Sequence, residues 1–274
     1  MKKTKDNIKR MAENFYLVFI MVFLYAPIAT LMVLSFSGSK SRTQWGGFSL
    51  RWYSEMLGSA TIMNALQNTL VIAFASALIA TVIGTAAAIA ISGMKTLPRT
   101  VIMGITNIPM LNADIVTGIS LMLAFIAFGI SLGFKTILIA HITFNIPYVI
   151  LSVMPKLKQT NKSVYEAAMD LGASPIYAFF KVVFPDILPG VLSGFLLAFT
   201  MSLDDFIITH FTKGAGINTL STLIYSEVRR GIKPSMYALS TVIFVAVLTL
   251  LIITNFAPKR TSNDRKPKTG GAGV

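Results

Sequence analysis

Residues 163–189 read SVYEAAMDLGASPIYAFFKVVFPDILP and form a polar, helix-coded insert between long apolar segments. Ser163 is followed three residues later by Glu166. This spacing is typical of a capping box, in which each side chain bonds a backbone N–H at the start of a helix. The stretch therefore predicts a short helix that begins at Ser163 and ends near Leu171, and the apolar segments on either side hold it in place.

Glycine and proline divide the same stretch into two parts. Gly172 tolerates the positive φ that commonly ends a helix. Ser174 and Pro175 match the cap and the first position of a second helix. Because proline lacks a backbone donor and clashes with the preceding turn, we expect this second helix to stop at Pro185, and Pro189 to mark the entry to the next apolar span. The predicted pattern is helix, glycine turn, helix.

The composition is that of a membrane protein. Of the 274 residues 54% are hydrophobic and the mean hydropathy is +0.69, whereas a soluble domain is about 45–50% apolar. The chain has no cysteine, which excludes disulfides and thiolate metal sites. Its net charge of +13 does not indicate nucleic-acid binding, because the basic residues lie between apolar runs and no basic-aromatic module is present.

Six apolar segments of about 20 residues predict six membrane-spanning helices, since a bilayer core needs helices of that length. The first differs from a cleaved signal peptide because its apolar run exceeds the roughly 7–15 residues of a signal core. We expect an all-α membrane protein that forms a single transmembrane domain over residues 1–274. The six expected spans are about 15–36, 68–92, 101–129, 136–155, 190–212 and 236–258.

Lys and Arg are distributed unequally between the two sides of these spans. Of the 24 residues, 16 lie in the N-terminal segment, the second loop, the central insert and the C-terminal tail, and 8 lie on the opposite side. The positive-inside bias therefore places both termini and the insert, about 157–189, in the cytoplasm. The tail, about 259–274, is polar and glycine-rich, and we expect it to be flexible.

Three carboxylates lie inside the expected spans, where an ionised side chain costs at least about 2.5–3.5 kcal/mol. Asp114 follows a proline and an asparagine, which predicts a broken helix whose freed backbone groups face a cavity or a partner helix. Two alternatives remain for Asp114 itself: it faces the cavity, or it caps the broken helix. Both are compatible with the pattern.

Asp204 and Asp205 are adjacent, halfway along the fifth expected span. Neighbouring helical positions differ by about 100°, so in a regular helix the two side chains cannot point the same way. One can face a transport path while the other caps or pairs locally. Because no Lys or Arg lies inside a span, the pattern favours a cationic ligand, a basic partner or a proton over an internal salt bridge.

The remaining polar and aromatic residues of interest are few. His141 and His210 lack the spacing of metal ligands, so we interpret them as structural hydrogen-bonding groups. Trp45, Trp52 and Tyr53 lie among polar residues, as is typical of the membrane interface. The chain contains no nucleophile elbow, H-E-x-x-H pair or P-loop, so we expect no catalysis by it.

The insert resembles the EAA signature of ATP-binding-cassette (ABC) importer permeases through Glu166-Ala167-Ala168, Gly172 and Val182-x-Phe184-Pro185. The spacing matches, and the departures are apolar, with Val182 in place of isoleucine and Phe184 in place of leucine. In that family the segment docks into a groove on the ATPase subunit. The resemblance therefore implies an ATPase-coupling role for six residues: Glu166, Ala167, Ala168, Asp170, Gly172 and Pro185.

Nearly the whole chain is similar to PotC-type permeases of spermidine/putrescine ABC importers. The likeness is carried by Trp45-Gly46-Gly47-Phe48 with Arg51-Trp52-Tyr53-Ser54, Asp114-Ile115-Val116, His141-Ile142-Thr143-Phe144, the EAA stretch, and Ser202-Leu203-Asp204-Asp205. It implies the MetI-like fold of type I importers and a location in the bacterial inner membrane. It also implies three partners: a homologous second permease, an ATPase dimer that binds ATP and Mg, and an extracytoplasmic polyamine-binding protein.

The resemblance also implies which residues meet the cargo. Polyamines are flexible multications, and an acidic lining favours them over anions or neutral sugars. Asp114, Asp204 and Asp205 are the expected contacts, with Trp52 at the outer mouth through cation–π contact. The alternatives are an importer for iron or another cationic solute, and a secondary transporter in which the carboxylates relay protons.

Overall fold

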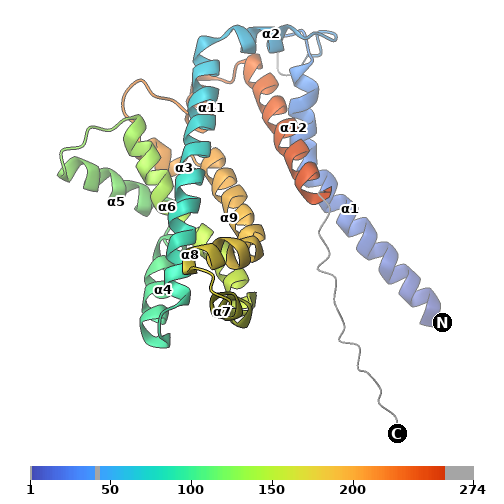
Figure 1. Cartoon of the computed structure of the whole chain (residues 1–274). Helices are drawn as coiled ribbons and strands as arrows, with labels where there is room; N and C mark the ends of the chain where they lie inside the picture. Colours follow the sequence, from blue (N-terminus) through green and yellow to red (C-terminus); the bar gives the residue numbers. More distant parts are fainter. Residues whose placement is uncertain (1, 41–43, 257–274) are drawn as a thin grey trace. The chain divides into compact units, whose positions relative to one another are not determined.

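The structure, a computed structural model, describes residues 2–40 and 44–256, and its regular elements are helices, apart from one isolated β-bridge between Ser37 and Phe48 (Figure 1). Its described residues divide into two compact units, residues 2–40 and 44–56 with 233–256, and residues 57–232. The tail expected to be flexible, 259–274, lies outside the described residues. An all-helical fold agrees with the expected class.

The first unit is built on two long apolar helices. α1 (Lys2–Ser35) packs against α12 (Pro234–Phe256), and Figure 1 draws the blue and red helices side by side. After α1, the ring of Phe36 stacks on that of Phe48, with 5.5 Å between centroids. These aromatic contacts hold the segment that leads into α2 (Arg51–Gly58).

Three helices form the core of the second unit: α3 (Ala60–Ser92), α6 (Phe134–Gln159) and α9 (Phe184–Asp204). Apolar helices in a bilayer gain little from hydrophobicity between themselves, so close packing of small residues holds them together. Val149 of α6 lies between Gly84 of α3 and Gly194 of α9. A Cβ on Gly84 would lie 2.8 Å from the Val149 Cβ, so this contact depends on glycine.

Replacing Gly84 with valine is expected to destabilise the second unit, because the added side chain overlaps Val149 in a packed core. Overpacking of this kind costs about 1–3 kcal/mol. Gly104→Val is the matched control, since a Cβ on this helical glycine meets nothing within 4 Å. Thermal aggregation of the purified protein, followed by size-exclusion chromatography, should show a lower midpoint for Gly84→Val alone.

A sharp break separates α4 (Thr96–Leu111) from α5 (Asp114–Ala127), which meet at 103°. The break predicted near Asp114 is therefore confirmed. Four helices in the described residues are long and apolar enough to cross a membrane, and the bent pair makes a fifth if it counts as one span. In α12 the apolar stretch Pro234–Thr249 is shorter.

The capping residue of the insert's first helix lies two residues earlier than predicted. α7 (Lys162–Asp170) is capped by Asn161, whose side chain accepts the Ser163 N–H at 3.0 Å, so the capping box at Ser163 was wrong. Asn and Ser are both good caps, and the sequence offers both within three residues. The glycine turn is confirmed, because Gly172 has φ +88°.

The expected stop at Pro185 is also wrong. α8 (Pro175–Ala178), capped by Ser174, continues through a π-helical turn (Phe179–Val183) into α9. In the π turn the Phe184 N–H bonds the Phe179 carbonyl, and Pro185 follows in the first turn of α9, where a missing donor costs little. The expected span 190–212 therefore starts earlier and ends at Asp204, and α10 (Ile207–Thr212) is a separate helix.

Candidate functional site

Two helix breaks of the second unit open onto one cavity. The α4–α5 break and the α9–α10 break lie beside α6, and the cavity between them has a volume of about 370 Å³. Its wall is mostly apolar and aromatic, with carboxylates at the breaks. The lining residues are Pro109, Asp114, Thr117, Phe144, Tyr148, Thr200, Met201, Asp204, Asp205, Phe206, Ile207 and Ile208.

Asp114 and Asp204 present free carboxylates to this cavity. Asp114 is exposed in the first turn of α5, where the helix dipole favours a negative charge. Asp204 is the last residue of α9 and is also exposed. Across the described part of the chain neither carboxylate has a hydrogen bond or ion pair. Both can therefore accept hydrogen bonds from a ligand.

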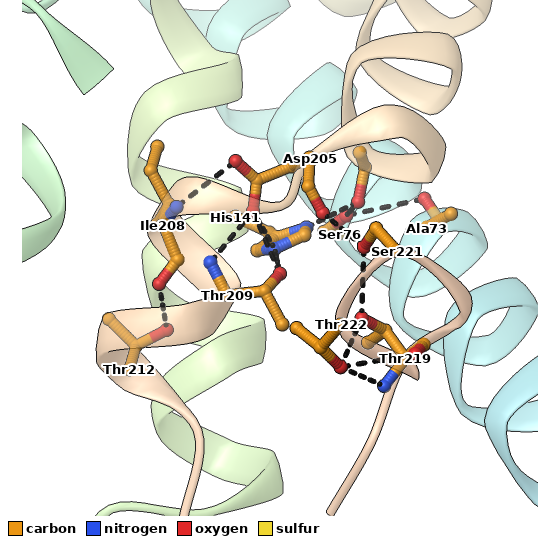
Figure 2. Close-up of polar contacts among 11 residues, drawn as sticks. Ala73, Ser76, His141, Asp205, Ile208, Thr209, Thr212, Thr219, Ser221 and Thr222 are labelled. Carbon is orange, nitrogen blue, oxygen red and sulfur yellow. Dashed lines mark hydrogen bonds and ion pairs between the residues drawn. The ribbon is translucent and has the colours of Figure 1, made fainter. Parts of the chain in front are cut away.

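Asp205 differs from its neighbour because both of its carboxylate oxygens are engaged. Its backbone is extended (φ −63°, ψ 123°), which ends α9 after Asp204. Oδ1 accepts the Ile208 N–H at 3.2 Å, and Oδ2 accepts the N–H and the hydroxyl of Thr209, each at 2.7 Å (Figure 2). Asp205 thus caps α10.

A buried imidazole completes the cap. His141 of α6 is 1% exposed, and its Nε2 lies 3.3 Å from Asp205 Oδ2 and 2.9 Å from Thr209 Oγ1. Because a carboxylate can only accept, the Nε2 that faces it carries a proton, and Nδ1 is hydrogen-bonded to the Ser202 hydroxyl. His141 therefore makes the structural hydrogen bonds that its sequence context predicted.

This network continues across the core. The Ser202 hydroxyl of α9 hydrogen-bonds Ser76 of α3 at 3.1 Å, and Ser221 of α11 (Leu220–Arg230) donates to the Asp205 carbonyl at 2.7 Å. We call the group Ser76, His141, Ser202, Asp205 and Thr209 the latch, because it joins α3, α6, α9 and α10. The sequence interpretation missed its hydroxyl members. The only sequence signal for these residues is a hydroxyl side chain within an apolar span, which is a weak indication.

Trp52 is buried in the structure, not exposed at an outer mouth as expected. It belongs to the first unit, its side chain is 1% exposed, and its indole N–H donates to the Ser37 carbonyl. The Arg51 guanidinium lies over the ring, 5.3 Å from the centroid. This indole is a structural anchor whose cation–π partner is already present, so the expected cation–π contact with a cargo does not fit this geometry.

The EAA residues lie on the surface of the second unit. Glu166, Ala167 and Asp170 are exposed on α7, and Gly172 forms the turn to α8. Large apolar side chains are exposed beside them: Leu171 is 89% exposed, Ile176 73% and Tyr177 59%. These three residues, which sequence reasoning missed as a group, form the apolar turn. On a polar segment such a patch is typical of a protein–protein contact.

A helical bundle with broken spans, a carboxylate-lined cavity and an exposed apolar turn defines a membrane-embedded transport component. The chain belongs to the family of binding-protein-dependent transport system inner membrane components, which matches residues 80–261. Members of this family are transport subunits, so the chain is not an enzyme.

Relatives of known activity are similar along most of the chain. The putrescine transport system permease protein PotI of Escherichia coli K12 is 38% identical over 89% of this chain and 89% of its own. The spermidine/putrescine transport system permease protein PotC of Haemophilus influenzae is 35% identical over 92% of this chain and 98% of its own.

Solved structures share the fold. A chain of a bacterial ABC transporter involved in alginate import has a TM-score of 0.71 at 16% identity, covering 92% of this chain and 94% of that chain. The MetNI methionine ABC transporter gives 0.57 at 20% identity, covering 72% and 95%. The fold is therefore that of ABC importer transmembrane subunits, as the resemblance implied.

Proposed function

We propose that this chain is one of two permease subunits of an ABC importer that carries polyamines such as putrescine and spermidine. The proposal rests on one observation, the two unpaired carboxylates of Asp114 and Asp204 in the same cavity. The names of relatives at 35–38% identity support the same cargo. The chain acts as a single permease domain, with its partner permease forming the other half of the path.

The chemistry of the cavity suits a flexible multication. Ammonium groups donate charge-assisted hydrogen bonds to carboxylates, and these strengthen in surroundings of low dielectric. Phe144, Tyr148 and Phe206 supply the apolar wall between the two acids, against which a methylene chain can pack. Asp205 contributes indirectly, because it fixes the break that ends α9 at Asp204.

We place six helical spans in the bacterial inner membrane, with α12 as the sixth and both termini in the cytoplasm. The positive-inside distribution supports this orientation. In this orientation α7 and α8 lie on the ATPase side. The loops after α1 and α10 lie on the outer side, where they would contact an extracytoplasmic polyamine-binding protein. ATP and Mg are bound by the ATPase dimer, and this chain holds no cofactor.

The apolar turn and the EAA residues form the contact with the ATPase. Leu171 and Ile176 would enter a groove of that subunit, where their burial contributes about 1.5–3 kcal/mol each. Because α8 continues through the π turn into α9, a displacement of the apolar turn is carried directly to Asp204 at the cavity. Closure of the ATPase dimer can therefore move the acid that holds the cargo.

The Asp114→Asn and Asp204→Asn variants test the cargo site. Each removes a charge that pairs with an ammonium group, and we expect spermidine uptake by reconstituted importer to fall about tenfold for each. Glu55→Gln, an equal loss of charge at an exposed position of α2, is the control. Normal uptake by both cavity variants would refute the site. Uptake competed by Fe³⁺ but not by putrescine would assign a different cation.

A further inference from the structure

A second cavity, of about 320 Å³, lies against one face of α11. Thr222, Tyr225, Ser226, Arg229 and Arg230 recur at helical spacing along this face, and His210 and Lys213 close the cavity from the end of α10. The opposite face of α11, with Leu220 and Leu223, is buried where the helix packs near α3. The second cavity is therefore a built feature of both helices, distinct from the acidic one.

Three cations line the second cavity, and no carboxylate does. Within residues 2–40 and 44–256, Lys213, Arg229 and Arg230 form no ion pair. Their contacts are with neutral groups: Lys213 Nζ donates to the Asn218 amide oxygen at 2.8 Å, and the Arg229 guanidinium lies 5.8 Å from the Tyr225 ring centroid. Burial lowers the pKa of the Lys213 ammonium. An anion in this cavity would offset both the repulsion and the desolvation.

The place of this cavity in the chain indicates where the anion comes from. It follows the apolar α9 and the short α10, at the point where the sequence turns polar. On α11, Tyr225 is 42% exposed and Val228 is 53% exposed beside the two arginines. Apolar and basic side chains together on an amphipathic helix are typical of the headgroup region of a bilayer. A cationic cargo would be repelled here.

We propose that the second cavity binds a phosphate group, either of an anionic phospholipid headgroup or of free phosphate. Two guanidinium forks and one ammonium supply more donors than a planar carboxylate can use, whereas a phosphate offers several acceptor oxygens. This site goes beyond cargo transport. Its occupation would tether α10 and α11, which flank the latch.

The test measures binding to the full-length chain in the assembled importer, solubilised in neutral detergent. Short-chain phosphatidylglycerol, short-chain phosphatidylcholine, inorganic phosphate and succinate are titrated in turn. We expect the wild-type protein to bind phosphatidylglycerol at least about tenfold more tightly than the Arg229→Gln/Arg230→Gln variant does, because the variant loses the bidentate guanidinium contacts. Lys40→Gln/Lys135→Gln, an equal loss of two charges at exposed residues outside the cavity, should match wild type.

The four ligands distinguish a lipid headgroup from free phosphate, and the variants show whether the second cavity is the binding site. Tight phosphatidylglycerol with weak phosphate identifies a lipid headgroup, and equal affinities identify free phosphate. The Arg229→Lys/Arg230→Lys variant, which keeps the charge, should fall between wild type and the glutamine variant. Binding unchanged in the glutamine variant would overturn the site. Succinate binding as tightly as phosphate would overturn the phosphate assignment.

Discussion

Replacing Leu171 with aspartate, or Glu166 with lysine, is expected to abolish uptake while the permease still inserts and folds. The Leu171 side chain is 89% exposed beside the glycine turn, so the folded permease does not depend on it for stability. In the proposed function it is buried in the ATPase groove, where a charge is left desolvated and unpaired. The loss of a buried contact of this kind corresponds to about 2–4 kcal/mol, or a fall in coupling of about 30- to 1,000-fold.

Leu57→Asp is the matched control, since Leu57 is 63% exposed at the end of α2, outside the EAA segment. Two measurements separate coupling from folding: spermidine uptake in cells, and co-purification of the ATPase with the permease. We expect the Leu171→Asp variant to lose both and the control to keep both. Full uptake by Leu171→Asp and Glu166→Lys together would contradict the assignment of α7 and α8 to the ATPase contact.

The sequence predicted local features of the insert well where one residue type decides the backbone. Gly172 has the expected positive φ, and Ser174 caps α8. The prediction failed where two neighbouring residues compete: Asn161 and Ser163 are both good caps, and the structure has Asn161 as the cap. It failed at Pro185 as well, because a π turn is set by tertiary context and carries no clear sequence signal.

At the candidate site too, features set by neighbouring residues could be predicted, whereas contacts between residues far apart in the sequence could not. The break before Asp114 was predictable from the proline and asparagine that precede it. The pairing of Asp205 with His141 was not, because 64 positions separate them in the sequence. Treating residues 190–212 as one regular helix also hid the change of direction that gives Asp204 and Asp205 different roles.

Replacing Asp205 with alanine is expected to destabilise the second unit, whereas the same change at Asp204 affects transport alone. Asp205 accepts two backbone N–H groups and the Thr209 hydroxyl, and it faces a buried imidazole. Its removal leaves these donors without their acceptor at a position where the side chain is only 9% exposed. The expected cost is about 2–4 kcal/mol. Asp205→Asn keeps one carbonyl oxygen and should lose less.

The measurement is the midpoint of thermal aggregation in detergent for Asp204→Ala, Asp205→Ala, His141→Ala and the Asp205→Ala/His141→Ala pair. Because Asp205 and His141 share Thr209 as well as their own contact, their effects should be non-additive, with the double variant little worse than Asp205→Ala alone. Equal midpoints for the two aspartate variants would show that the latch does not hold the break. Strict additivity would show that His141 stabilises α6 independently of Asp205.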